Sequence, residues 1–376
     1  MALANAKLPD TSLARLPLVS VIVPIYNGEA DLPGLLQCLQ AQTYPAARVE
    51  YLLVDNGSSD RTLELLELAA SQFSQTEIAP AVPAIDSQTD HPAHPIEEPA
   101  WHRRIQLRVL SETQIQSSYA ARNCGIRAAI GEILAFTDAD CRPQPDWLLH
   151  LVQPFQQAGS EKIGIVAGEI LPLPGTSLLE RYADRHQILS QCHTLSHSFY
   201  SYGQTANLAV RRQALEQAGL FRPWLTTGGD ADLCWRIQQQ GFWQLQFAEQ
   251  AIVQHRHRST WRELRHQWTR YGRSNCYLHE LHGVALAQPL TRRETFYRLS
   301  RWLLKEIPIV LRQTVTEQGF SSLKRSQGES WIDAVMDTPI GLLCRHWRTI
   351  GQQESALPEA ACQVEWFPQT ATVQNL

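Results

Sequence analysis

Aspartates recur just after apolar runs or tight turns at three separate places in this chain of 376 residues, as Asp55, Asp138, Asp140, Asp230 and Asp232. In an open α/β sheet, the loops at the carboxyl ends of the strands bring side chains from distant parts of the chain into one crevice. Carboxylates gathered there repel one another, and a divalent cation is the simplest compensation for oxygen ligands of this kind. The pattern therefore predicts a metal-assisted site at one edge of a sheet.

Short β-branched runs alternate with amphipathic stretches over most of the chain. A leucine stripe from Leu32 to Leu39 has helical spacing and lies between two such runs, so the chain opens with a strand, a helix, a strand and a helix. That order implies a mostly parallel, Rossmann-like sheet flanked by helices. Strands are expected at 19–25, 49–54, 105–110, 132–136 and 163–170, and further helices at 63–68, 120–130 and 231–239 and near Pro145.

Composition limits the class of protein. A hydrophobic content of 44% over 376 residues suits one catalytic domain with a smaller appendage, and the net charge of −4 gives no argument for nucleic acid. The eight cysteines form no Cys-x-x-Cys pair, and the N-terminus lacks the apolar stretch of a signal peptide. No run approaches the roughly 18 apolar residues that span a bilayer. We expect a cytoplasmic protein with reduced thiols, soluble or peripheral at the inner face of the membrane.

Changes in composition divide the chain. Residues 74–100 hold five prolines, five carboxylates and no lysine or arginine, which is typical of a mobile surface insertion. Residues 297–312 combine Arg298, Arg301 and Lys305 with apolar positions, as in a basic amphipathic helix on an anionic membrane. An ordinary surface helix packed on its own domain is the alternative. The predicted divisions are an N-terminal tail at 1–17, a catalytic domain at 18–275, a helical and possible membrane-contact region at 276–349 and a flexible tail at 350–376.

Six stretches together resemble the motifs of inverting glycosyltransferase family 2, which has the nucleotide-binding glycosyltransferase type A fold. They are Val-Ser-Val-Ile-Val-Pro-Ile-Tyr-Asn (19–27), Leu-Leu-Val-Asp-Asn-Gly-Ser-Ser-Asp-Arg-Thr (52–62), Ala-Arg-Asn-Cys-Gly-Ile (121–126), Gly-Glu-Ile-Leu-Ala-Phe-Thr-Asp-Ala-Asp (131–140), Thr-Ala-Asn-Leu-Ala-Val-Arg-Arg (205–212) and Gly-Gly-Asp-Ala-Asp-Leu-Cys-Trp-Arg (228–236). The resemblance implies a nucleotide-diphosphate sugar as donor, a glycan or lipid-linked hydroxyl acceptor, and Mg²⁺ or Mn²⁺.

The resemblance gives roles to the donor side. Asp140 matches a metal ligand and Asp138 a metal or ribose contact, and the ion would stabilise the charge that develops on the leaving diphosphate. Asp55 matches the residue that reads the nucleotide base. A solvated turn for the Asp138 and Asp140 pair, and a helix cap for Asp55, are the structural alternatives.

Three further residues would complete the nucleotide site. Tyr26 could stack on the base, with Pro24 beside it at the end of the first strand. Arg122 lies in a motif that approaches the nucleotide in the family. A helix-surface arginine paired with a carboxylate is the alternative for Arg122.

Asp230 matches the family's general base, which takes the proton of the acceptor hydroxyl as that oxygen attacks the anomeric carbon opposite the leaving diphosphate. A plain helix cap at the start of 231–239 is the alternative. The family commonly has Glu-Asp here, so Gly229 leaves the base in place but puts a supporting acceptor contact in doubt. Asp232 belongs to the same acceptor-side stretch, although its spacing from Arg236 favours a structural ion pair.

His255 follows an apolar run where related enzymes can supply a third metal ligand, and a solvated or core imidazole is the alternative. Gln267 and Arg270 match the Gln-x-x-Arg-Trp acceptor motif of processive members, but Tyr271 replaces the tryptophan. That departure argues against a polymer-extruding synthase, and a plain basic helix is the alternative. The tryptophans that could stack on acceptor sugars are Trp224, Trp235 and Trp268.

The sequence thus predicts a transferase that moves one sugar with inversion to a hydroxyl acceptor. A noncatalytic nucleotide- or glycan-binding module descended from such an enzyme is the second hypothesis, and the presence of both Asp140 and Asp230 argues against it. A nucleotidyltransferase would need a Gly-rich basic loop near the N-terminus, and Pro24-Ile-Tyr-Asn-Gly28 is not one.

Overall fold

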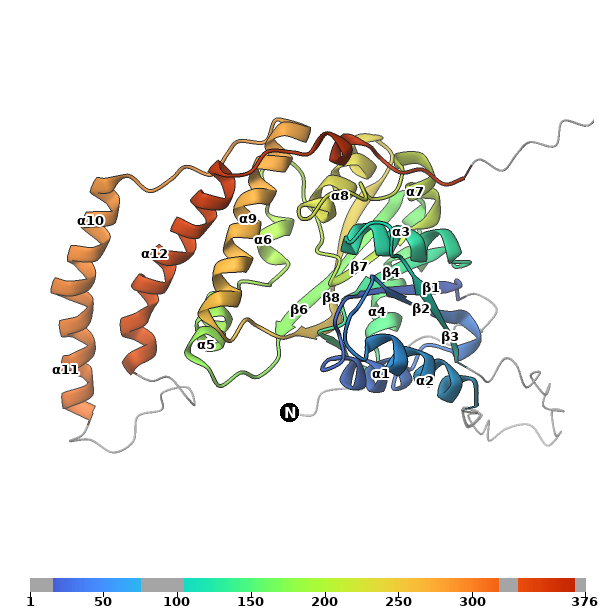
Figure 1. Ribbon diagram of the computed structural model, residues 1–376, viewed down its shortest axis with the longest axis horizontal. Coiled ribbons are helices and arrows are strands. Elements are labelled where there is room, and N and C mark those ends of the chain that lie inside the picture. Colours follow the sequence, from blue (N-terminus) through green and yellow to red (C-terminus); the bar gives the residue numbers. More distant parts are fainter. Residues whose placement is uncertain (1–15, 76–104, 318–330, 369–376) are drawn as a thin grey trace, which may run out of the picture.

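A computed structural model describes residues 16–75, 105–317 and 331–368. Its centre is one eight-stranded sheet with the order β3-β2-β1-β4-β7-β6-β8-β5 (Figure 1). Neighbours are parallel from β3 to β4 and between β6 and β8, whereas β7 is antiparallel to both its neighbours and β5 is antiparallel to β8. The predicted Rossmann-like, mostly parallel sheet is confirmed. The strands are β1 (Val19–Ile25), β2 (Val49–Asp55), β3 (Gln106–Ser111), β4 (Ile133–Thr137), β5 (Cys141–Pro143), β6 (Ile163–Pro172), β7 (Asn207–Arg211) and β8 (Gln244–His255).

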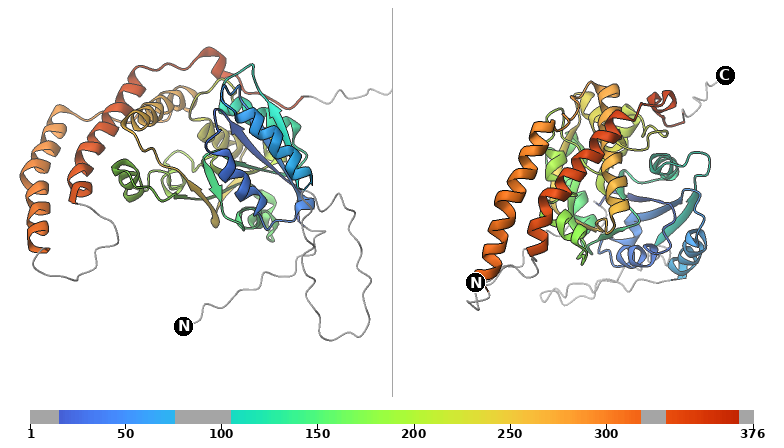
Figure 2. Two further views of the ribbon diagram at one scale, coloured as in Figure 1. Left: turned by 60° about the horizontal axis from the view of Figure 1, so that its bottom comes forward. Right: turned by 60° about the vertical axis from the view of Figure 1, so that its left-hand side comes forward.

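Helices cover both faces of this sheet (Figure 2). Because successive side chains of a strand point to opposite faces, the wholly buried β1 supplies two cores. Val21 and Val23 pack in one core with helices α1, α2 and α4, and Ile22 packs in the other with α3, α7 and α8. The helices of these layers are α1 (Leu32–Gln40), α2 (Thr62–Gln75), α3 (Ser118–Ala128), α4 (Trp147–Val152), α7 (Arg212–Ala218) and α8 (Gly229–Gln239).

The remaining helices form a second body against the β6 and β8 side of the sheet (Figure 1). Three of them, α10, a π-helical turn η6 and α11, follow one another without a break. In the described part of the chain, no helix is both long and apolar enough to span a bilayer. The elements are α5 (Leu178–Arg185), α6 (Cys192–Leu195), α9 (Trp261–His282), α10 (Arg292–Arg301), η6 (Trp302–Glu306), α11 (Ile307–Glu317) and α12 (Trp331–Gln353).

Helices α9 and α12 approach each other closely enough for their backbones to touch. A Cβ at Gly272 would overlap the carbonyl of Arg348, and one at Gly351 would overlap the carbonyl of Thr269. Glycine is needed at both positions because any side chain would push the helices apart. Asp333 at the other end of α12 is 1% exposed and accepts two hydrogen bonds from one arginine of α5. Helix α12 is therefore fixed at both ends against the catalytic domain.

The prediction of a flexible tail at 350–376 is wrong for its first half. Residues 350–353 end α12, and residues 354–368, here called the strap, run back over the face that carries α3 and α7. Glu365 accepts hydrogen bonds from Asn123 and Arg127, and its carbonyl accepts one from the backbone of Leu220. Both polar pairing and the apolar residues Leu357, Ala361 and Phe367, which pack on the core below, hold this segment, and neither leaves a hydrophobic period in the sequence. The rest of the predicted tail, and residues 76–100 of the predicted insertion, lie outside the described residues.

Candidate active site

The loops after β1 and β2 are bound to each other at the carboxyl edge of the sheet. The backbone of Gly28 donates to Thr62 at 2.8 Å, and the side chain of Asn27 accepts from the backbone of Ser59 at 2.8 Å. Tyr26, 53% exposed, lies beside this junction, and Pro24 is buried in β1. These hydrogen bonds hold together the two loops that the sequence predicts to bind the nucleotide base.

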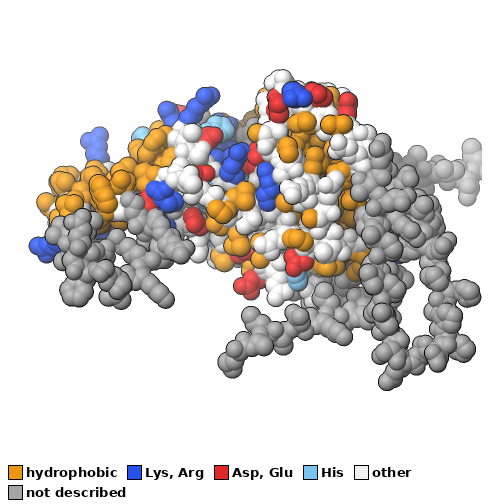
Figure 3. Space-filling view, turned by 90° about the horizontal axis from the view of Figure 1, so that it is seen from below, with side chains coloured by type: hydrophobic (Ala, Val, Ile, Leu, Met, Phe, Trp, Pro, Cys, Tyr) orange, Lys and Arg blue, Asp and Glu red, His pale blue; other side chains and the backbone are white. Residues whose placement is uncertain are grey.

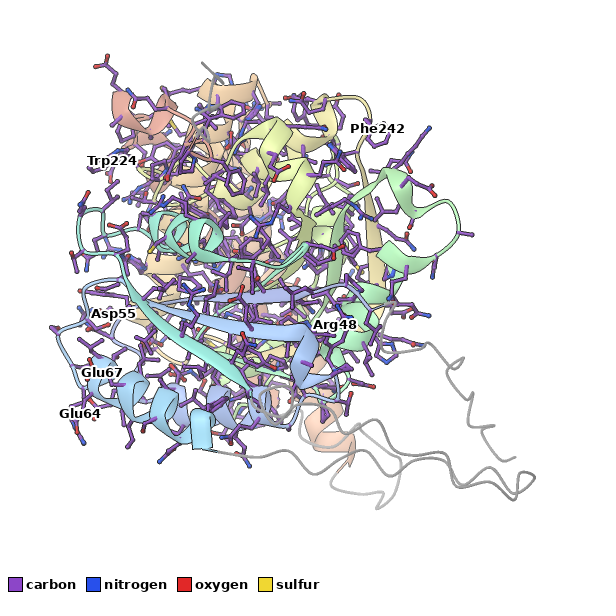
Figure 4. All side chains as sticks on the ribbon, turned by 90° about the vertical axis from the view of Figure 1, so that its right-hand side faces the viewer. Arg48, Asp55, Glu64, Glu67, Trp224 and Phe242 are labelled. Atoms are coloured by element: carbon purple, nitrogen blue, oxygen red, sulfur yellow. The ribbon has the colours of Figure 1, made fainter. Side chains whose placement is uncertain are left out.

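Asp55 ends β2 at this edge, and Figure 4 shows it at the end of the strand opposite Arg48. Its buried carboxylate accepts from the backbone amides of Gly57 at 3.2 Å and Ser58 at 3.3 Å. The cap of α2 is made instead by Asp60, which accepts from the backbone of Thr62 at 3.0 Å. The helix-cap alternative for Asp55 is therefore wrong, and its carboxylate organises the loop on which it stands.

Arg122 and Asp138 form one charged unit. Arg122 lies on α3 but is only 3% exposed, and its Nη2 is 2.5 Å from Oδ1 of Asp138. The alternative for Arg122 is confirmed in its pairing with a carboxylate and wrong in its surface position, because the side chain is buried. Its buried Nε has no hydrogen-bond partner in the described structure. This unit therefore keeps a donor free for a further acceptor.

The pairing of β5 with β8 brings His255 to Asp140. Cys141 is opposite His255 in this antiparallel ladder, which places the preceding aspartate within 3.3 Å of Nε2 of the imidazole. Nδ1 of His255 lies 2.8 Å from the carbonyl of Arg256 and must donate to it, because a carbonyl can only accept. A neutral ring then presents the lone pair of Nε2 toward a carboxylate oxygen, an arrangement that a cation bound between the two would satisfy. A protonated ring would instead donate from Nε2 to the carboxylate.

The donor set therefore fits Mg²⁺ or Mn²⁺. Asp140 supplies oxygen and His255 supplies an oriented nitrogen, both suited to these ions. Cys141 lies within reach of the same point, but its thiol contacts the carbonyl of Ala206, and burial raises its pKa well above the usual value. A protonated thiol is a poor ligand. Arg258, 3.6 Å from Asp140, adds positive charge beside the pair.

Asp230 stands in the first turn of α8, which starts after Gly228 in a left-handed conformation with φ of 80°. Its carboxylate accepts from the hydroxyl of Thr205 at 3.0 Å and from the backbone of Thr205 at 3.4 Å. Burial raises the pKa of Asp230, the charge of Arg122 opposes that shift, and the charge of Asp138 adds to it. A carboxylate with a raised pKa is a better proton acceptor near neutral pH than an exposed one.

Tyr119 explains the glycine that precedes this base. A Cβ at Gly229 would collide with the Tyr119 ring, and the Tyr119 hydroxyl accepts from the backbone of Gly229 at 3.0 Å. The ring also stacks on Phe221 with centroids 5.4 Å apart. Tyr119 therefore occupies the space that a side chain at position 229 would fill, and its hydroxyl makes the polar contact there. The sequence did not single out this residue.

Asp232 is a structural residue, and its prediction as an acceptor contact is wrong. It is fully buried and accepts hydrogen bonds of 3.0 Å each from Arg222, Arg236 and His282. The predicted ion pair with Arg236 is confirmed. Burial alone would raise the pKa of Asp232, but His282, Arg236 and Arg222 lower it to about 2. Its carboxylate ties α8 to α9 and to the loop before α8.

A cavity of about 820 Å³ lies between the sheet edge and helices α5, α6, α9 and α12. The predicted residues that line it are Arg122, Asp138, Asp230, His255, Gln267 and Arg270. The Arg122–Asp138 unit, the base and His255 thus share one space. The Asp55 loop does not line it, so the predicted nucleotide site extends beyond this cavity.

The predicted tryptophans lie in three different settings. Trp268 lines the cavity, Trp235 is fully buried in the core, and Trp224 is 46% exposed on the same side of the molecule as Asp55 (Figure 4). Stacking of Trp235 on a sugar is therefore excluded.

Two residues that contact the base region were not predicted as site residues. Thr205 lies inside one of the motif stretches of the sequence, whereas nothing in the sequence pointed to Tyr119.

The chain matches the family model described as Glycosyltransferase like family 2 over residues 17–274. It is 32% identical over 291 residues to the glycosyltransferase AglE of Haloferax volcanii, covering 77% of this chain and 81% of that protein. It is 30% identical over 153 residues to an undecaprenyl-phosphate 4-deoxy-4-formamido-L-arabinose transferase of Pseudomonas aeruginosa, covering 40% of this chain and 36% of that one.

Among solved structures, a mannosyltransferase of Pyrobaculum calidifontis in complex with GDP-Man and Mn²⁺ superposes with a TM-score of 0.51 at 16% identity. The match covers 89% of this chain and 87% of that one. At this identity the likeness concerns the fold, and it extends into the helices that follow residue 274.

Proposed function

The chain belongs to glycosyltransferase family 2, and we propose that it moves one sugar with inversion from a nucleotide-diphosphate donor to a hydroxyl acceptor. The observation that carries the proposal is a base, Asp230, with a raised pKa in the same cavity as the Arg122–Asp138 unit and His255. Inversion needs one positioned base on the acceptor side, and Asp230 is placed to be that base.

The donor side of the proposed reaction is formed by residues at the ends of β1, β2 and β4. Tyr26 and Asp55 would hold the nucleotide base, and Arg122 would act with Asp138 to orient the ribose and diphosphate. Asp140 and His255 would hold Mg²⁺ or Mn²⁺, which supplies Lewis-acid stabilisation of the leaving diphosphate when bound. The GDP-Man and Mn²⁺ bound by the similar mannosyltransferase support this assignment.

The transfer itself needs one proton movement by this chain's residues. The acceptor hydroxyl donates to Asp230 as its oxygen attacks the anomeric carbon, and the C–O bond to the diphosphate breaks on the opposite face. Thr205 holds the carboxylate through a side-chain and a backbone hydrogen bond, so that its free lone pairs face the cavity. General base catalysis of this kind contributes about 10²–10⁴-fold to rate.

The first test is calorimetric titration of purified protein with nucleoside diphosphates and nucleotide sugars, with and without Mn²⁺, followed by donor hydrolysis. The variants are Asp140→Ala, His255→Ala and Asp230→Asn. We expect the first two to weaken Mn²⁺-dependent nucleotide binding, and the third to abolish turnover while nucleotide still binds. Nucleotide binding without turnover in the wild type, under all donors and acceptors tried, would favour the noncatalytic binding module.

We further propose that α10 and α11 rest on an anionic membrane surface. Phe296 and Leu304 are 73% and 75% exposed, and Arg301 and Lys305 share a surface site with Leu304. Figure 3 shows hydrophobic side chains gathered at this end of the molecule with basic side chains beside them. An apolar face flanked by cations is typical of helices that lie in the lipid interface.

A further inference from the structure

Helix α12 brings arginines into the cavity from outside the part of the chain that the family model covers. Arg345 and Arg348 of α12 and Arg298 of α10 line the cavity together with Arg270 of α9. The family match ends at residue 274, so it covers neither α10 nor α12. Arg298, predicted above to belong to a membrane-binding face, lines the cavity instead. The position of Arg345 and Arg348 is set by the Gly272 and Gly351 contact that holds α12 against α9.

These arginines differ from the other arginines near the cavity. Arg122 is paired with Asp138, and Arg185 of α5 is 2.6 Å from Asp337 of α12. In the described structure, by contrast, no carboxylate lies within 4 Å of the four guanidinium groups named above. Glu294 interacts with the charges of Arg298 and Arg345 at longer range, without an ion pair to either. The cavity therefore has an excess of positive charge at its α12 wall.

Of these four arginines, Arg348 would be stabilised most by a bound anion. Its Nε donates to Oδ1 of Asn275 at 2.7 Å, and the described structure gives its two terminal nitrogens no partner. Burial lowers its pKa, and the neighbouring charge of Arg345 lowers it further. A partly buried guanidinium without a counter-charge is destabilising, and an anionic group between the two arginines would remove that cost.

This wall lies close to the catalytic carboxylate. The charges of Asp230 and Arg348 both act on the hydroxyl of the buried Tyr202, which lines the cavity. Tyr271, a further cavity residue, acts on the same hydroxyl. Asp230, Tyr202 and Arg348 line the same cavity, so an acceptor that spans it can place a hydroxyl at Asp230 and another group at Arg348.

We infer that the acceptor carries an anionic group, a phosphate or a sugar carboxylate, which Arg348 and Arg345 bind while Asp230 receives the proton of the acceptor hydroxyl. The inference rests on the proposed function and narrows its acceptor class. A phosphate could belong to a lipid-phosphate carrier, and a carboxylate to an acidic sugar of a glycan. The planar carboxylate and the tetrahedral phosphate each present a pair of oxygens that a guanidinium group binds through two parallel hydrogen bonds.

The test is calorimetric titration of the full chain, without donor, with two matched pairs of probes. Octyl phosphate is compared with octyl glucoside, and methyl glucuronide with methyl glucoside. We expect wild-type protein to bind the anionic member of at least one pair roughly 10- to 100-fold more tightly, the range expected for hydrogen bonds to a charged group. Preference in the first pair identifies a lipid phosphate, and preference in the second an acidic sugar.

The variants decide whether these arginines are responsible. Arg348→Met and Arg345→Met should each remove most of the preference, and Arg348→Lys should keep part of it. Arg262→Met is the matched control, because Arg262 is an exposed residue of α9 outside the cavity lining and should leave the preference unchanged. The inference is overturned if wild-type protein shows no preference in either pair, or if the preference survives in Arg348→Met and Arg345→Met.

Donor measurements on the same proteins separate this inference from the proposed function. Arg348→Met should bind nucleotide with the affinity of the wild type. If Arg348→Met instead weakens nucleotide binding, the arginine contacts the donor and the inference fails. If wild-type protein binds no nucleotide but keeps an Arg348-dependent preference for anions, the proposed function fails while the anion site stands.

Discussion

Replacing Asp232 with asparagine is expected to lower the free energy of unfolding by about 3 kcal/mol, a magnitude that follows from its environment. Its pKa is about 2, against 3.8 for a free side chain. A pKa lowered this far on folding corresponds to about 2 kcal/mol of stability at neutral pH. The variant also leaves Arg222 and Arg236 buried beside a neutral group, and removing one partner of a buried pair costs about 3–5 kcal/mol.

Urea denaturation at pH 7 measures this change. Asp146→Asn is the matched control, because the side chain of Asp146 is 50% exposed and its ion pair is with His150 on the same helix. The control should change the free energy of unfolding by less than about 1 kcal/mol. Because the pKa of Asp232 is lowered on folding, its contribution is complete above about pH 4 and is lost as the pH falls toward 2. The difference between wild type and variant should therefore stay constant from pH 8 to pH 5.

The same variant tests the other interpretation of Asp232. If it were an acceptor contact, Asp232→Asn would raise the KM for acceptor and leave the urea midpoint where it is. An unchanged midpoint would refute the structural argument, since three hydrogen bonds to a fully buried carboxylate cannot be lost without cost.

Three more predictions concern the base, the helix contact and the membrane face. Thr205 donates hydrogen bonds that favour ionised Asp230, so Thr205→Val should raise the pKa of that base and move the acid limb of the kcat profile to higher pH; an unmoved limb would exclude Asp230 as the titrating group. Gly272→Ala should destabilise the protein by about 1–3 kcal/mol in urea denaturation because its Cβ overlaps α12, whereas Gly341→Ala, whose nearest neighbour is at 3.4 Å, should not. Leu304→Asp should reduce sedimentation with anionic vesicles, and Phe242→Asp, a 46% exposed residue elsewhere on the surface, should not; equal losses would count against the membrane face.

The pattern of buried strands was readable from the sequence because fully buried parallel strands are continuous β-branched runs. The expected strand at 19–25 coincides with β1, and the other predicted strands agree within about two residues at each end. Asp55, Asp138 and Asp230 were identifiable for a related reason, since each directly follows a buried strand or a glycine turn. In an α/β fold such positions must lie at the loop edge of the sheet.

Two features of the site could not be derived from local sequence. Asp140 and His255 were expected as metal ligands only through the family resemblance, because their approach depends on the register of β5 against β8, which joins residues 114 positions apart along the chain. Tyr119 fills the space beside Gly229 because α3 packs on α8, which a glycine in the sequence does not reveal.

The sequence by itself indicated five strands of the sheet, β1 to β4 and β6, and the residue types at its carboxyl edge, because hydrophobic period and turn chemistry are local properties. The strands β5, β7 and β8 and their places in the sheet were decided by the tertiary structure. Only the tertiary structure decided that Arg348 enters the cavity, that Asp232 is buried among cations and that the strap packs on α3. Each of these depends on which charged side chain meets which partner across distant segments. The sequence shows that a residue is charged, but not what it pairs with. Packing brings that residue to solvent, to a structural partner or to a substrate, and this decides its role.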